Sequence, residues 1–141
     1  MDRIRAIIKQ YWGYDVLRPL QHEAMVAAAE GRDCLAVMPT GGGKSLCYQA
    51  PALLSDKPTV VVSPLIALMK DQVDNLNQRG IAAAFLNSSL DAADRRRVAA
   101  GIYNQTYKLI FVAPERFAHE PFYDMLAKAG VGAFAIDEAH C

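Results

Sequence analysis

A glycine-rich segment near residue 40 constrains the fold of this chain more than any other feature. An apolar run over residues 34–38 leads into Pro39, Thr40, Gly41, Gly42, Gly43, Lys44 and Ser45, and a helix-like stretch follows to residue 54. Glycines let a backbone approach phosphates closely, and successive N–H groups then point at the anion. Lys44 is suited to neutralise β- and γ-phosphates, and the Ser45 hydroxyl suits Mg²⁺. The segment predicts a nucleoside-triphosphate site between a strand and a helix.

An acidic pair follows the last apolar run of the chain, residues 131–136. Ligands of open parallel sheets bind outside the carboxyl ends of the strands, where Asp137 and Glu138 would lie. Asp137 is therefore suited to hold Mg²⁺, and Glu138 to orient or deprotonate an attacking water. His140 is close enough in sequence to couple this site to later residues.

Apolar runs alternate with amphipathic stretches along the whole chain. Strands are predicted over residues 34–38, 59–62, 81–86, 108–112 and 131–136, and helices over 4–11, 21–30, 44–54, 65–78, 91–103 and 120–129. Ser89 or Asp91 is the expected cap of the fifth helix. This alternation predicts an α/β fold with a mostly parallel sheet covered by helices on both faces.

Composition narrows the class of protein further. The 141 residues are 52% hydrophobic and 21% charged with zero formal net charge, which suits one domain with a buried core. A net charge of zero does not by itself indicate nucleic-acid binding, although it does not exclude a local basic patch. Three cysteines fit neither a disulfide framework nor a zinc pair, so a reducing cytoplasmic setting is expected. No apolar stretch approaches the roughly 18 residues of a membrane span.

The phosphate loop and the acidic run together resemble the RecQ family of DNA helicases, within the superfamily 2 helicases. Residues 38–49 look like motif I of that family; its first position, occupied here by Met38, need not be glycine in superfamily 2. Residues 137–141, Asp-Glu-Ala-His-Cys, look like motif II. Residues 12–21, 62–72 and 112–116 are similar to motifs 0, Ia and Ib, so the resemblance covers nearly the whole chain.

The resemblance implies a RecA-like P-loop domain over residues 1–141, truncated, with residues 1–30 as the helical motif 0 region. Motif 0 recognises adenine: Gln21 can pair both amide groups with the base, and Tyr14 or Arg18 can pack on its face. The family usually has phenylalanine where Leu17 stands, which changes a packing detail. Trp12 and Tyr14 are alternatively core aromatics. Motifs Ia and Ib touch single-stranded DNA, through candidates Ser63, Lys70 and Arg116.

The resemblance also implies an activity: an ATP-dependent 3′–5′ DNA helicase that uses ATP and Mg²⁺ to unwind DNA in recombination and repair, with single-stranded and forked DNA as its partners. Its catalytic residues would be Lys44, Asp137, Glu138 and His140. Its place of action would be the bacterial nucleoid or a nucleus. RecQ helicases need a second lobe that supplies an arginine to the γ-phosphate. The chain ends at Cys141, so we expect a fragment that hydrolyses ATP poorly and unwinds nothing.

Other functions stay open on the sequence alone. A DEAD-box-like RNA helicase usually differs at the Gly-Gly-Gly-Lys-Ser loop and at His140 and Cys141. A P-loop phosphotransferase acting on a small molecule would leave motifs 0, Ia and II unexplained, and a non-catalytic nucleotide- or DNA-binding module would use the same residues. Lys70 is equally a solvated helix lysine. The run Arg95, Arg96 and Arg97 is expected to fan around a helix axis as a mainly solvated face.

Overall fold

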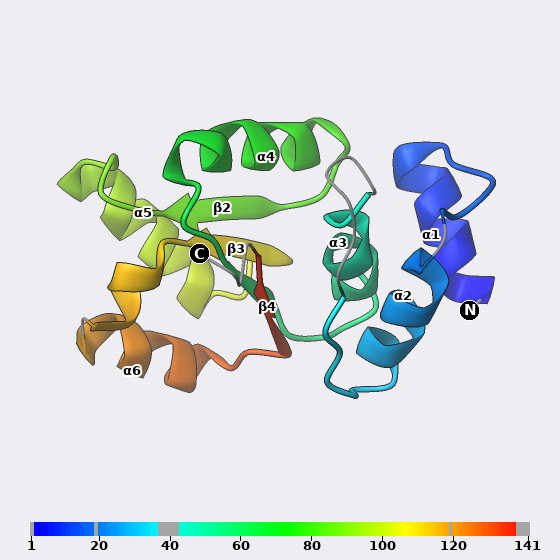
Figure 1. The fold of residues 1–141 in the computed structure, drawn as a ribbon. Coiled ribbons are helices and arrows are strands. Elements are labelled where there is room, and N and C mark those ends of the chain that lie inside the picture. Colours follow the sequence, from blue (N-terminus) through cyan, green and yellow to red (C-terminus); the bar gives the residue numbers. More distant parts are fainter. Residues whose placement is uncertain (1, 19, 37–42, 119, 138–141) are drawn as a thin grey trace. The chain divides into compact units, whose positions relative to one another are not determined.

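The computed structural model describes residues 2–18, 20–36, 43–118 and 120–137. The chain divides into two compact units, Met1–Ser55 and Asp56–Cys141, and each is described by itself (Figure 1). None of the described helices combines the length and the apolar character that a bilayer crossing demands.

The described residues of the first unit form three helices: α1 (Asp2–Trp12), α2 (Gln21–Ala29) and α3 (Leu46–Ala52). Their apolar faces share a small core, as the helical spacing of the sequence predicts. The buried side chains of this core are Ile4, Ile8, Met25, Leu46 and Ala50. Trp12, Leu17 and Leu54 pack against it from partly buried positions.

The strand predicted over residues 34–38 is not formed where the structure describes it. Residues 32–36 belong to no helix or strand, and the Leu35 side chain is 84% exposed. Residues 37 and 38 lie outside the described residues. A strand requires a neighbour that takes its backbone hydrogen bonds, and the described part of the first unit contains no other strand. An apolar run alone was therefore an insufficient signal.

The second unit contains a four-stranded, fully parallel sheet in the order β2-β3-β1-β4. The strands are β1 (Thr59–Val62), β2 (Ala83–Leu86), β3 (Leu109–Val112) and β4 (Ala133–Ile136). The helices α4 (Ile66–Gln78), α5 (Ala92–Tyr103) and α6 (Glu120–Ala129) connect them. A short 3₁₀ helix, η1 (Pro114–Ala118), was not predicted. The predicted α/β class with a parallel sheet is confirmed.

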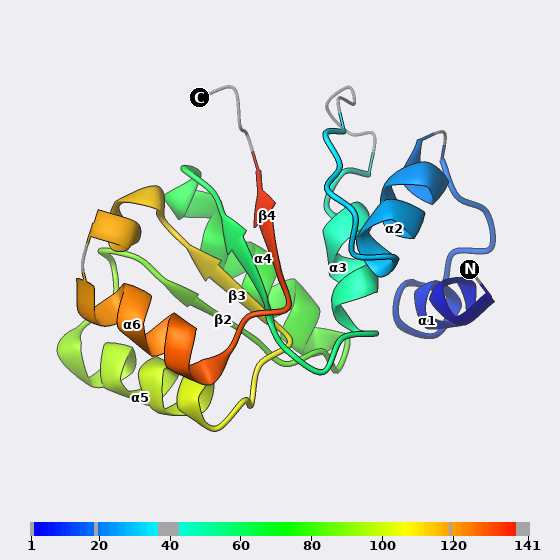
Figure 2. The ribbon, with the colours of Figure 1, turned by 90° about the horizontal axis from the view of Figure 1, so that it is seen from below.

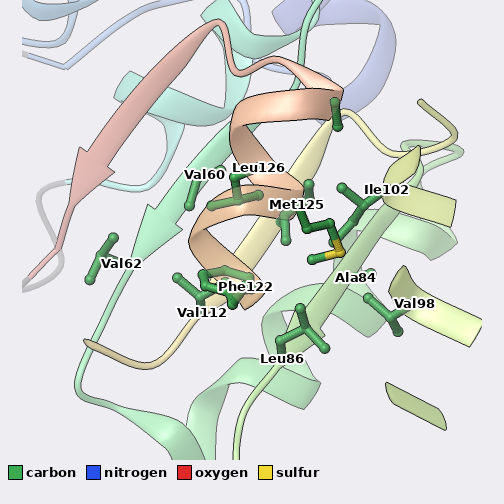
Figure 3. Close-up of a cluster of buried hydrophobic side chains, with 12 residues drawn as sticks. Val60, Val62, Ala84, Leu86, Val98, Ile102, Val112, Phe122, Met125 and Leu126 are labelled. Atoms are coloured by element: carbon green, nitrogen blue, oxygen red, sulfur yellow. The ribbon is translucent and has the colours of Figure 1, made fainter. Parts of the chain in front are cut away.

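Helices cover both faces of this sheet, α4 on one and α5 with α6 on the other (Figures 1 and 2). Figure 3 shows the core under α5 and α6, where alternate strand residues meet the two helices. Strands β1 and β3 are buried along their whole length, as central parallel strands should be. Strand β4 lies at the edge and is largely exposed, with Phe134 packed against Phe117.

Local hydrogen bonds settle how α5 begins. The Asp91 carboxylate accepts a 2.8 Å hydrogen bond from the Asp94 backbone N–H, so Asp91 is the cap. Ser89 bonds to the Asn87 side chain instead, through both its backbone N–H and its hydroxyl. Of the two expected caps, the structure selects the one that directly precedes the helix.

Candidate functional site

The described part of the phosphate loop consists of Gly43, Lys44 and Ser45. Gly43 has a φ of +80°, a left-handed conformation that favours glycine. Lys44 and Ser45 form a half-buried turn that leads into α3, and the Ser45 hydroxyl makes no capping hydrogen bond to that helix. The hydroxyl is thus not engaged in capping, and an oxygen ligand of this kind fits Mg²⁺. Pro39, Thr40, Gly41 and Gly42 lie outside the described residues.

Gln21 joins motif 0 to the phosphate loop. Its side chain is only 4% exposed. Its Oε1 accepts a hydrogen bond from the Arg18 backbone N–H at 2.6 Å, and its Nε2 donates to the Gly43 carbonyl at 3.1 Å. A Cβ built on Gly43 would also lie 3.6 Å from Cδ of Arg18. The structure therefore brings Arg18 and Gln21 together at the last glycine of the loop.

The Gln21 amide is already partly used in this arrangement. One N–H and one oxygen lone pair are committed to backbone groups, which leaves one donor and one acceptor for a ligand. The sequence predicted a direct contact with adenine and missed the internal bonds. Their partners are distant in the chain, since Gly43 lies 22 residues from Gln21.

Tyr14 lies on the surface of the first unit. Its side chain is 52% exposed, so it is not a core aromatic. It lines a cavity of about 230 Å³ together with Arg5, Lys9 and Leu17 of the same unit. Trp12 is half-buried beside the helical core, which is the alternative that the sequence left open for it.

In the second unit, three predicted site residues follow the carboxyl ends of adjacent strands. The Ser63 backbone N–H donates to Val112 at 3.1 Å, and the Asp137 backbone N–H donates to Val62 at 2.9 Å. Ser63 therefore lies between Asp137, after β4, and the turn after β3 that carries Arg116. We call this row Asp137–Ser63–Arg116 the carboxyl edge. Glu138 and His140 lie outside the described residues.

The side chains of Ser63 and Lys70 differ in their availability. Ser63 is 2% exposed, and its Oγ accepts a hydrogen bond from the Leu65 N–H at 3.2 Å, which fixes the turn into α4. Lys70 is exposed and pairs with Asp74 at 2.7 Å. The hydrogen bond from Lys70 to Asp74, and then the negative charge of Asp74, raise the pKa of the lysine. Lys70 is thus cationic and accessible, whereas Ser63 is suited to position backbone groups.

Arg116 is half-buried on η1. Its guanidinium carbon lies 5.6 Å from the centroid of the Phe122 ring, a cation–π arrangement. Its Nε is buried and has no hydrogen-bond partner among the residues that the structure describes. The side chain is therefore held in place while one of its donors is unsatisfied.

Cys47 on α3 offers a chemical test of the environment next to the phosphate loop. Burial, and secondarily the electrostatic effect of Cys34, raise the pKa of the Cys47 thiol to about 11. Cys34 is exposed. At pH 8 a thiol with that pKa is only about 10⁻³ thiolate, against roughly a quarter for an ordinary one. We expect iodoacetamide to label Cys34 at least about 100-fold faster than Cys47.

Peptide mass mapping after timed alkylation measures both rates in one sample. The Cys47 rate should rise about tenfold per pH unit between pH 8 and 10, because the thiolate is the reactive form. In urea the two thiols should react alike, which controls for local sequence effects. A Cys47 rate that levels off below pH 9 would contradict the raised pKa.

Comparison with known proteins shows which protein family the chain belongs to. The family profile "DEAD/DEAH box helicase" matches residues 18–141. This match covers most of the chain, including the loop before α3, the turns after β1 and β3, and the acid after β4. The chain belongs to the DEAD/DEAH box helicase family.

Comparison with individual proteins shows which helicases within this family the chain resembles. The chain is 46% identical to an ATP-dependent DNA helicase RecQ of Haemophilus influenzae over 96% of its own length and 22% of that protein. It is 44% identical to an ATP-dependent DNA helicase RecQ of Bacillus subtilis over 100% of its length and 24% of that protein. A putative ATP-dependent RNA helicase of Acanthamoeba polyphaga mimivirus is 38% identical over 99% of the chain and 25% of that protein. The resemblance to RecQ helicases is confirmed, and the chain spans about a quarter of these relatives.

Proposed function

We propose that this chain supplies the nucleotide-binding part of an ATP-dependent DNA helicase that unwinds DNA in the 3′–5′ direction. The observation that carries the proposal is the 46% and 44% identity to two proteins named ATP-dependent DNA helicase RecQ, across nearly the whole chain. Family membership argues against the small-molecule phosphotransferase. The function in recombination and repair, the action on forked DNA and the location at a nucleoid or nucleus belong to the same proposal.

Roles for the nucleotide-site residues follow from their chemistry. Lys44 pairs with the β- and γ-phosphates as a point charge. Ser45 and Asp137 offer a hydroxyl and a carboxylate oxygen, the ligand type that Mg²⁺ prefers. Glu138 orients or deprotonates the attacking water, and His140 couples the site to the rest of the protein. When bound, ATP with Mg²⁺ supplies the phosphoryl group whose release drives movement.

Base and strand recognition complete the proposal. The remaining donor and acceptor of Gln21 contact the adenine edge, and Arg18 or Tyr14 packs on the ring face. Ser63 and Arg116 of the carboxyl edge, with Lys70 on α4, contact the backbone of single-stranded DNA through phosphate groups, which position a strand without reading its sequence.

Titrations of the chain test this proposal. A fluorescent ATP analogue should bind only with Mg²⁺, and Lys44→Ala should weaken binding roughly 10–100-fold, because a charge-assisted contact is lost. Lys128→Ala removes an exposed lysine of α6 and should leave binding unchanged. Oligo-dT should bind more tightly than oligo-U of equal length.

Each titration has an outcome that contradicts part of the proposal. Equal nucleotide binding by the wild-type chain and Lys44→Ala would remove the phosphate loop from the site. A clear preference for oligo-U would move the function to the RNA helicases, as one of the relatives suggests.

A further inference from the structure

A basic pocket lies between α5, η1 and α6 in the second unit. Its volume is about 360 Å³, and three arginines line it: Arg95 and Arg96 from α5, and Arg116 from η1. Leu86, Phe122 and Met125, which are drawn in Figure 3, also line it and are themselves almost fully buried. The pocket thus combines an apolar surface with three guanidinium groups.

The three neighbouring arginines of α5 do not all belong to this pocket. Arg97 pairs with Asp94 at 3.1 Å and does not line it. Arg95 donates one N–H to the Leu90 carbonyl at 3.3 Å, and the rest of its fork stays available. Arg96 has no hydrogen-bond or ion-pair partner among the described residues. The fan predicted from the sequence is correct, but two of its members converge on one cavity.

The charge of this pocket is not compensated from within. None of the described residues that line it is acidic. Within the described part of the chain, the buried Nε of Arg116 has no acceptor, so an oxygen of a bound ligand would satisfy it. Three guanidinium groups with spare donors favour an anion with several oxygen acceptors, because the guanidinium fork matches phosphate geometry.

Position in the fold identifies the source of that anion. Arg116 belongs both to this pocket and to the carboxyl edge, where the proposed function places the DNA backbone. The pocket is therefore a continuation of that edge toward α5. Its apolar surface suits the sugar or base that accompanies each phosphate in a strand.

We infer that this pocket binds a phosphodiester unit of single-stranded DNA, with Arg95 and Arg96 extending the contact that begins at Arg116. The inference rests on the proposed function, because it needs a DNA strand along the carboxyl edge. It adds a contact region on α5 that recognises the backbone without regard to base sequence.

The salt dependence of oligo-dT binding tests the inference. For single strands, each phosphate contact adds about 0.7 to the slope of log affinity against log salt concentration. The double variant Arg95→Ala/Arg96→Ala should therefore lower the slope by about 1.4 and weaken binding roughly 25-fold near 0.1 M salt. The matched control Arg97→Ala/Lys128→Ala removes two exposed charges outside the pocket and should change the slope by less than about 0.3.

A second readout follows the pocket directly. In ¹⁵N spectra, the Arg116 Nε–H signal should shift on addition of oligo-dT to the wild-type chain, and this shift should be lost in Arg95→Ala/Arg96→Ala but kept in the control. Equal slopes for the two double variants, with wild-type DNA binding intact, would overturn the pocket assignment alone. Absence of oligo-dT binding by the wild-type chain would overturn the DNA function and the pocket with it. An unchanged slope together with tight, arginine-dependent binding of an Asp- and Phe-containing peptide would assign the pocket to a protein partner instead.

Discussion

Replacing Gly43 by alanine is expected to lower the free energy of unfolding of the first unit by about 3–4 kcal/mol and to weaken nucleotide binding. Two causes add together. Gly43 has a φ of +80°, which costs an alanine about 1–2 kcal/mol. The new Cβ would also meet the Gln21 side-chain nitrogen. Gln21 can move away only by breaking its hydrogen bonds to Gly43 and Arg18, at about 1 kcal/mol each.

Gly13→Ala is the matched control for this substitution. Gly13 has a φ of +74° in the same unit, but a Cβ there would meet nothing within 4 Å. It should therefore show the backbone cost alone. Urea unfolding followed by the fluorescence of Trp12, the single tryptophan of the chain, reports on this unit. If the two variants lose equal free energy of unfolding, the contact with Gln21 contributes nothing. The same conclusion would follow if Gly43→Ala kept its full effect in a Gln21→Ala background.

The parts of the fold that the sequence predicted well are those buried by their own neighbours. The strand predicted over residues 59–62 coincides with β1, and the helix predicted over 120–129 coincides with α6. A central parallel strand is covered on both faces, so its residues are continuously apolar and its ends are marked by polar or turn residues. A continuous apolar run also predicted strand β4. The run did not indicate that β4 lies exposed at an edge, because composition does not report the position of a strand in its sheet.

Features that depend on distant residues were not predictable. Leu20 has a left-handed φ of 71° at the start of α2, which no local pattern indicates for a leucine. The bonds of Gln21 depend on how α2 packs near Gly43. The apolar run at 34–36 satisfied every local rule for a strand and still lacks one in the described structure, because pairing is a property of two segments.

The candidate site shows the same division. Gly43, Lys44, Ser45 and Asp137 were found from motifs, since their chemistry is local to a turn or a strand end. Arg95 and Arg96 were read as part of a solvated run, and both are exposed, but the spacing of Ala92, Arg95, Arg96 and Ala99 also places them on a single helix face. The sequence therefore indicated that Arg95 and Arg96 share a helix face. It did not indicate that Arg116 joins them, because Arg116 belongs to a separate element, and only the packing of η1 against α6 brings it to the same pocket.

Phe111→Ala is expected to lower the free energy of unfolding by about 3–5 kcal/mol, the range for replacing a fully buried phenylalanine with alanine. The Phe111 side chain is 0% exposed on β3, between Val61 of β1 and Phe85 of β2 in the strand register. The substitution would leave a cavity between the two neighbouring strands. This cavity could not collapse without moving the sheet, because both strands are fixed by their pairing with β3. Against a total stability of about 5–15 kcal/mol for a typical domain, this single change should remove a large share.

Phe134→Ala provides the comparison within the same sheet. Phe134 is 56% exposed on the edge strand β4, and its ring centroid lies 6.2 Å from that of Phe117. Loss of that aromatic contact should cost about 1 kcal/mol. Urea unfolding by far-UV circular dichroism, with hydrogen exchange of the β1 and β3 amides, measures both variants. Similar losses of unfolding free energy for the two phenylalanines would contradict the assignment of β3 to the centre of the sheet and β4 to its edge.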